Sequence, residues 1–126
     1  MTRRAPGERK PGEYPARAIT LAESIDIDME RASEAKFQDW IIKRAVGYQW
    51  DPELIYHTRF SIDSPAGFPD LVLAKGARTI FWEVKAWNGK PTPKQEKWIA
   101  ALQVAGQEAR FVWPKDWREV DEELSK

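Results

Sequence analysis

Three charged residues lie in two segments of the chain that otherwise have the composition of buried β-strands. Asp70 opens the apolar run 70–73, and Glu83 and Lys85 lie within the apolar run 79–85. Charged groups are rare in such surroundings unless they are paired or bound to a metal. Because strand side chains alternate between two faces, Glu83 and Lys85 point to the same face. The pattern therefore indicates a charged site built on a β-sheet.

The spacing of the two strands predicts which charged residues meet. Residues 75–78 have the composition of a four-residue hairpin loop, and a hairpin centred between Gly76 and Ala77 places Asp70 opposite Glu83. Directly opposed side chains have Cβ atoms ~5 Å apart, and like charges at that distance are destabilising. A divalent cation between the carboxylates removes this conflict, and Mg²⁺ or Mn²⁺ fits such hard oxygen ligands best.

These groups together have the chemistry of a metal-dependent phosphodiesterase. A bound cation polarises a phosphate and activates water. Lys85 would orient that water or offset the charge that develops in the transition state. The alternative is a structural charge cluster within the sheet. A single lysine does not balance two acids, so we favour the metal site.

The same residues carry a resemblance to a known nuclease family. Pro69-Asp70 and Glu83-Val84-Lys85 resemble the signature of the PD-(D/E)XK nuclease superfamily. The order of several further elements resembles the VRR-NUC domain, the virus-type replication-repair nuclease, from about residue 30 to residue 114. Those elements are Gly67-Phe68-Pro69-Asp70, Thr92-x-x-Gln95-x-x-Trp98, Gly106, Glu34-x-x-x-Gln38 and Tyr56-His57-Thr58. The resemblance implies a restriction-endonuclease-like core, a small mixed β-sheet flanked by helices.

The resemblance also implies roles for individual residues. Asp70 and Glu83 would bind the metal, with the Val84 carbonyl as a third ligand. Glu34, on the preceding helix, would point into the site and reach the metal directly or through water. Lys85 would position the nucleophile.

Gln95 has two interpretations, which the sequence leaves open. Thr92 followed by Pro93 has the pattern of a helix start, and Gln95 at the third helical position would complete a capping box. The resemblance instead implies that Gln95 lies at the rim of the active site, where it would contact the substrate phosphate or a water on the metal.

The element order predicts an α/β fold. We expect a helix over 28–46, a strand over 54–60, the two hairpin strands, a helix from Thr92 to Gly106 and a strand over 109–113. The last strand is expected to run parallel to the strand that carries Glu83. We divide the chain into a flexible basic arm (1–24), the nuclease domain (25–114) and an acidic C-terminal tail (115–126).

Composition excludes several other kinds of site. The 126 residues suit one domain. The chain has no cysteine and only one histidine, His57, which excludes zinc sites that need several such ligands and argues against a Ser-His hydrolase. No apolar run reaches membrane length, and no signal-peptide core is visible. We therefore expect no membrane partner and a cytoplasmic location in a bacterial or phage-infected cell, on the nucleoid when bound to DNA.

The charge balance bears on the partner. Twenty basic residues match twenty acidic ones, whereas nucleic-acid binders are usually basic overall. The charges are distributed unevenly, with a basic arm and an acidic tail. The residues expected to contact DNA phosphates are Arg59, Lys90, Lys94 and Lys97.

The sequence thus predicts a Mg²⁺-dependent endodeoxyribonuclease, in which Mn²⁺ also functions. The expected substrate is branched DNA, a four-way junction or a flap, in replication, recombination or repair. Because small stand-alone members of the family resemble dimers that act on four-way junctions, we expect a homodimer with two sites related by a two-fold axis. The alternatives are a restriction-type or general nuclease on the same core and a non-catalytic nucleic-acid-binding module.

Overall fold

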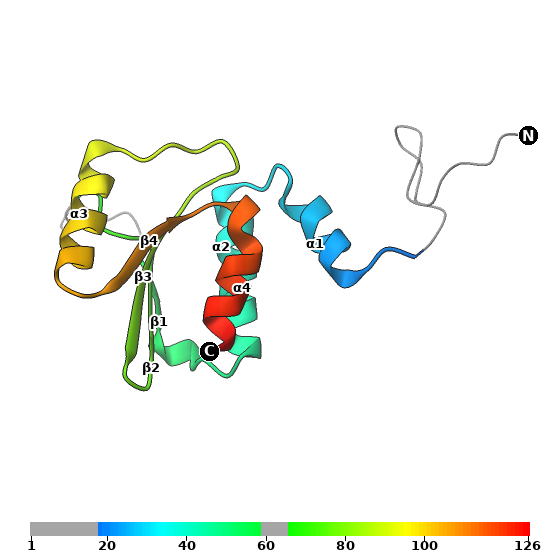
Figure 1. Ribbon diagram of the computed structural model, residues 1–126, viewed down its shortest axis with the longest axis horizontal. Coiled ribbons are helices and arrows are strands. Elements are labelled where there is room, and N and C mark those ends of the chain that lie inside the picture. Colours follow the sequence, from blue (N-terminus) through cyan, green and yellow to red (C-terminus); the bar gives the residue numbers. More distant parts are fainter. Residues whose placement is uncertain (1–17, 59–65) are drawn as a thin grey trace, which may run out of the picture.

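The computed structural model describes residues 18–58 and 66–126. This part of the chain is mixed α/β, with one four-stranded sheet in the order β1-β2-β3-β4. Helices α2 and α4 cover one face of the sheet, and α3 lies on the other (Figure 1). The elements are α1 (Leu21–Met29), α2 (Glu34–Gly47), η1 (Pro52–Leu54), β1 (Ile55–His57), β2 (Leu71–Lys75), β3 (Arg78–Val84), α3 (Pro93–Val104), β4 (Glu108–Val112), η2 (Pro114–Asp116) and α4 (Trp117–Ser125).

The hairpin between β2 and β3 has the predicted register. Lys75 pairs with Arg78 and Leu71 with Trp82, so the centre lies between Gly76 and Ala77. The turn itself contains two residues rather than four, and Gly76 takes a φ of +58°, which glycine adopts without strain. Strand β4 runs parallel to β3, as the sequence predicts.

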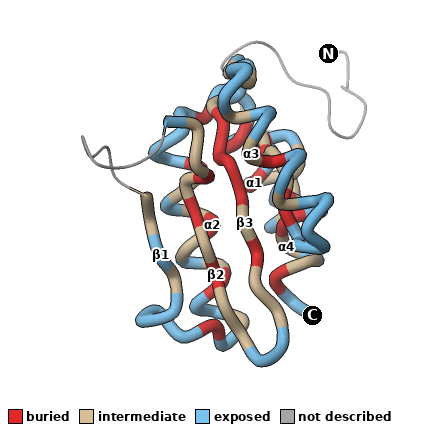
Figure 2. The backbone as a smooth tube through the Cα atoms, turned by 90° about the vertical axis from the view of Figure 1, so that its left-hand side faces the viewer, coloured by how far each residue is buried: buried red, intermediate tan, exposed pale blue. Residues whose placement is uncertain are grey.

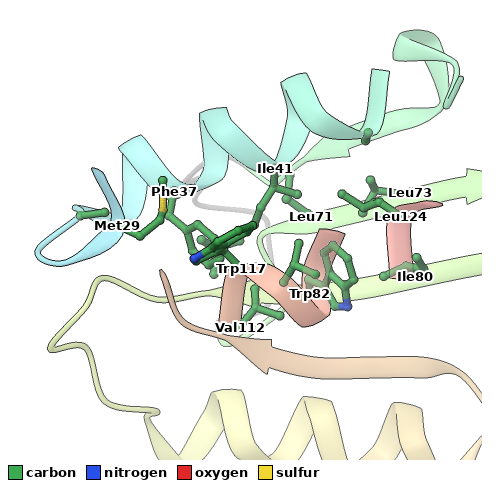
Figure 3. Close-up of a cluster of buried hydrophobic side chains, with 14 of the residues drawn as sticks. Met29, Phe37, Ile41, Leu71, Leu73, Ile80, Trp82, Val112, Trp117 and Leu124 are labelled. Atoms are coloured by element: carbon green, nitrogen blue, oxygen red, sulfur yellow. The ribbon is translucent and has the colours of Figure 1, made fainter. Parts of the chain in front are cut away.

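The hydrophobic core lies between the sheet and the helices α2 and α4. Leu71, Leu73 and Trp82 of the strands pack there against residues of both helices, including Phe37 and Leu124 (Figure 3). Because side chains alternate along a strand, the neighbours of Trp82 in β3 point toward α3 instead. Burial becomes continuous toward the C-terminal end of β3, where consecutive residues on both faces are buried (Figure 2).

The N-terminal helical region differs from the prediction. Two helices, α1 and α2, replace the single helix expected over 28–46. The hydroxyl of Ser33 accepts a hydrogen bond from the Lys36 N–H at 3.1 Å and starts α2 as its N-cap. The hydroxyl of Thr20 caps α1 in the same way through the N–H of Glu23. Part of the arm predicted over 1–24 is therefore helical, and its residues 1–17 lie outside the described residues.

The segment predicted as an acidic C-terminal tail, 115–126, is helical and packed against the rest of the fold. This segment forms η2 and α4, and α4 packs against α2. Trp117, Val120 and Leu124 of α4 are buried, and the Trp50 indole N–H donates to the Leu124 carbonyl at 2.8 Å. The apolar residues recur at helical spacing and form one buried stripe, while the carboxylates occupy the other faces.

Within residues 18–58 and 66–126, no helix combines the length and the apolar character that a membrane span requires.

Candidate active site

The hairpin register brings Asp70 and Glu83 together. The backbone N–H of Asp70 donates to Glu83 Oε2 at 3.2 Å. In return, the backbone N–H of Val84 donates to Asp70 Oδ2 at 3.0 Å. Each carboxylate is thus anchored by a backbone group from the neighbouring strand. The predicted juxtaposition of these two acids is confirmed.

The backbone of Asp70 is itself fixed by the segment that follows β1. Thr58 donates its backbone N–H to the Asp70 carbonyl at 2.7 Å and its hydroxyl to the Pro69 carbonyl at 2.6 Å. No local pattern predicts this role of Thr58, because only the tertiary pairing of β1 with β2 brings it beside residue 70.

The two carboxylates are poorly solvated. Glu83 is only 3% exposed. Burial raises the pKa of Glu83 to about 8, the negative charge and hydrogen bond of Asp70 act in the same direction, and the Lys85 ammonium opposes them. Burial also raises the pKa of Asp70, against the hydrogen bonds from Glu83 and from the Val84 N–H. Without a cation, the pair therefore retains a proton at neutral pH.

Lys85 is buried beside this pair and is held by Gln95. Its ammonium nitrogen donates to Gln95 Oε1 at 2.6 Å and lies 3.9 Å from Glu83 Oε1. Gln95 Nε2 donates to the same Glu83 oxygen at 2.9 Å. The amide of Gln95 thus bridges the lysine and the glutamate, and it fixes both side chains on the face of the sheet toward α3.

Gln95 also forms the capping box that the sequence suggests. Its Oε1 accepts the Thr92 N–H at 3.0 Å, and its own backbone N–H donates to the Thr92 hydroxyl at 3.2 Å. The capping box is therefore present, and the same side chain also contacts Lys85 and Glu83. Through Gln95, the first turn of α3 is hydrogen-bonded to Glu83 of β3 and to Lys85, which follows that strand.

Glu34 lies at the start of α2, close enough for its charge to interact with the site. Partial burial raises the pKa of Glu34, the Asp70 charge raises it further, and the Lys85 ammonium opposes the shift. One turn further along α2, Gln38 Nε2 lies 3.1 Å from His57 Nδ1. This hydrogen bond links α2 to β1. The sequence predicts the helical spacing of Glu34 and Gln38 but not the partner of Gln38.

The donor set can be compared with what a metal requires. Among the described residues, no three His, Cys, Asp or Glu side chains are grouped so that they could hold a metal ion. Asp70 and Glu83 are thus the side-chain ligands on which a site would depend, with the Val84 carbonyl as a candidate third ligand. Mg²⁺ commonly binds proteins through only one or two carboxylates and keeps several waters. The hard oxygens and excess negative charge here fit such a cation.

Several basic residues near the site have no ion pair with the described acids. The expected DNA contacts Lys90, Lys94 and Lys97 belong to this group, whereas Arg59 lies outside the described residues. Arg31, Lys36 and Lys115, which the sequence analysis did not select, also belong to it. These residues lie at the start of α2 and α3 and after β3 and β4, which is one end of the molecule (Figure 1). The basic residues with a carboxylate partner are Lys43, Arg44, Arg78, Lys85, Arg110, Arg118 and Lys126.

Lys94 and Lys97 also line a surface hollow of about 480 Å³ together with Trp98. The loop before Asp70 approaches α3 closely at this point, because a Cβ on Gly67 would lie 2.6 Å from the Lys94 backbone carbon. Glycine is thus required at residue 67, where φ is +89°.

Two comparisons with known proteins leave the family open. No protein-family model matches the chain, and no curated protein matches it.

Proposed function

We propose that this chain is a Mg²⁺-dependent endodeoxyribonuclease on a PD-(D/E)XK-like core. The observation that supports the proposal most is the Asp70–Glu83 pair, anchored by backbone N–H groups beside the buried ammonium of Lys85. This is the arrangement of acids and base that the VRR-NUC resemblance implies.

A purely structural charge cluster accounts poorly for these residues. Glu34, Asp70 and Glu83 all have a raised pKa, and among the described residues Lys85 is the cation that opposes each of these shifts. Such an arrangement costs folding free energy unless another positive charge is supplied. A divalent cation would supply that charge, and the retained carboxylates would then be explained by function.

Each residue has a defined part in the proposed reaction. Asp70 and Glu83 would hold the cation, which when bound would reduce the charge on the phosphate and lower the pKa of a water. Lys85, oriented by Gln95, would place its ammonium against the charge that develops on the phosphoryl oxygens. Glu34 would add negative charge near the cation and accept a hydrogen bond from a water at the site.

The charge distribution supports DNA as the substrate. The net charge of zero is a sum over the whole chain. The cations that have no ion pair with a described acid, Arg31, Lys36, Lys90, Lys94, Lys97 and Lys115, lie at the end of the molecule that holds the site. Such a local excess attracts a polyanion even when the whole chain is neutral. We propose branched DNA as the preferred substrate and a homodimer as the active form, in the cytoplasm of a bacterial or phage-infected cell.

The proposal is tested by cleavage of labelled four-way junction, flap, linear duplex and single-stranded DNA. We expect cleavage with Mg²⁺ or Mn²⁺, none with EDTA, and a loss of at least ~10²-fold in Asp70→Asn and in Lys85→Ala. Asp39→Asn is the matched control, because Asp39 is an exposed acid paired with Lys43. Activity of Asp70→Asn equal to that of the wild type would overturn the assignment. Metal-independent DNA binding without cleavage of any substrate would instead identify a non-catalytic binding module.

A further inference from the structure

Trp87 is an exposed tryptophan that follows Lys85 by two residues. It is 47% exposed, whereas Trp50, Trp82 and Trp117 are buried. Its backbone N–H donates to the Ala32 carbonyl at 3.0 Å. This hydrogen bond joins the segment after β3 to the segment before α2. Trp87 is two residues from Lys85, and Ala32 is two residues from Glu34. The backbone of Trp87 is therefore fixed at the edge of the candidate active site.

The cations around Trp87 contact aromatic rings rather than carboxylates. The Arg31 guanidinium lies 5.4 Å from the centre of the Trp87 ring, and the Lys115 ammonium lies 5.8 Å from that of Trp113. Neither cation forms an ion pair with an acid among the described residues. A cation that rests on an aromatic ring is held in place but is still able to bind an anion.

A hollow of about 270 Å³ lies beside Trp87. Its lining includes Met29, Trp87, Pro114, Lys115 and Trp117. Asp26 and Glu30 also contribute, but the Asp26 carboxylate is bound by the Arg118 guanidinium at 2.8 and 2.9 Å and by the Trp117 indole N–H. The volume is slightly below the ~300 Å³ at which drug-sized ligands fit, so it suits a single flat ring system.

We propose that this hollow, with Trp87, Arg31 and Lys115, is a binding site for one unpaired nucleobase of a DNA substrate. The base would stack on the indole, and Arg31 and Lys115 would bind the phosphates on either side of it. Stacking on an aromatic side chain requires a base that is free of its neighbours in the strand, and it does not depend on sequence. The inference rests on the proposed nuclease function and narrows its substrate to DNA with unpaired nucleotides next to the cleaved bond.

The test measures binding in EDTA, where the proposed chemistry cannot occur. The probes are an oligothymidylate that contains one 2-aminopurine and a blunt duplex of the same length. We expect Trp87→Ala to weaken binding of the single strand by roughly 10-fold or more, as removal of one stacking partner does, and to abolish quenching of the 2-aminopurine. Trp87→Phe should retain most of both effects. Binding of the duplex should change by less than about 2-fold.

Tyr56→Ala is the control, because Tyr56 is also an exposed aromatic residue, 61% exposed, but lies on the edge strand β1. Its single-strand affinity should equal that of the wild type. Wild-type binding and quenching in Trp87→Ala would overturn the inference, and so would an equal loss of affinity for single strand and duplex. The nuclease proposal is judged separately. If the wild-type protein cleaves DNA but Trp87→Ala binds single strands normally, only the proposed base-binding site is refuted. If binding depends on Trp87 but the wild-type protein cleaves no DNA, only the proposed nuclease activity is refuted.

Discussion

Gln95 accepts a hydrogen bond from the Lys85 ammonium at 2.6 Å through the same oxygen that accepts the Thr92 N–H. One amide oxygen therefore completes the N-terminal capping box of α3 and orients the buried Lys85 ammonium. A displacement of the first turn of α3 would move Gln95 and with it both Lys85 and Glu83. Lys94 and Lys97 lie in the same helix. If α3 binds DNA as proposed, its DNA contacts would be physically connected to Glu83 and Lys85 through Gln95.

The double function of Gln95 predicts that two neighbouring substitutions have different effects. Thr92→Ala removes the cap and should cost about 1 kcal/mol of stability, with cleavage reduced only moderately because the Gln95 side chain remains. Gln95→Ala also frees Lys85 and Glu83 and should reduce cleavage far more. Melting temperatures and kcat/KM of both variants test this. A pair of variants with equal losses of activity would contradict the assigned role of Gln95.

The raised pKa of Glu83 predicts how stability depends on pH. In the metal-free folded protein this pKa is about 8, against 4.5 for an ordinary glutamate. Between these two values the unfolded chain has released a proton that the folded chain retains, so stability falls as pH rises. We expect the melting temperature in EDTA to decrease from about pH 5 to about pH 8.

Two comparisons show whether Glu83 causes the decrease in melting temperature with pH. Most of this decrease should disappear in Glu83→Gln. It should remain in Glu122→Gln, which changes an exposed residue of α4. If Mg²⁺ binds between the carboxylates as proposed, it would replace the shared proton, and its stabilising effect should be larger at pH 8 than at pH 5.5. A pH profile of Glu83→Gln identical to that of the wild type would refute the assignment.

The pairing of Asp70 with Glu83 was predicted more accurately from the sequence than the surrounding helices were. The register of Asp70 and Glu83 depends only on a local turn at Gly76 and on strand alternation, and both can be read from neighbouring residues. The contact of Gln38 with His57 depends instead on how α2 lies against β1. No local pattern contains that information.

The errors in the helices have a different cause. Ser33 followed by Glu34 is a helix-start signal, but apolar residues continue with helical spacing across it, and this spacing favours one continuous helix. In α4 the carboxylates dominated the interpretation, although Trp117, Val120 and Leu124 form an apolar stripe. A charge count does not show which face of a helix carries the charges, and here they lie on the faces away from the core.

The packing of α4 predicts that the end of the chain is needed for stability. Leu124 is fully buried against the core. Leu124→Ala should destabilise the fold by about 2–5 kcal/mol, as removal of a buried leucine side chain does. Urea denaturation checks the value. Glu122→Ala, on an exposed residue of the same helix, should change stability by less than about 0.5 kcal/mol, and an equally small effect of Leu124→Ala would show that α4 does not contribute to the core.

The proposed action on branched DNA predicts self-association. One chain of 126 residues offers little surface to a four-way junction, and a two-fold dimer would present two sites to two strands. Light scattering should therefore show a homodimer, alone or with a junction. A strict monomer under both conditions would contradict the dimer, and equal cleavage of junction and linear duplex would contradict the preference for branches.

The unpaired cations predict the salt dependence of DNA binding. Each phosphate contact releases counterions, so the logarithm of the affinity falls with the logarithm of salt concentration by about 0.9 per contact on duplex DNA. The double variant Lys94→Ala, Lys97→Ala should lower this slope by about 2. Lys126→Ala should leave it unchanged, because Lys126 is already paired with Glu123 at 2.9 Å. Titrations of duplex DNA at several salt concentrations in EDTA give the slopes of the wild type, the double variant and Lys126→Ala.

The same slope in the wild type and the double variant would show that the first turns of α3 do not contact the phosphates. The DNA would then have to lie along Arg31, Lys36 and Lys115 instead.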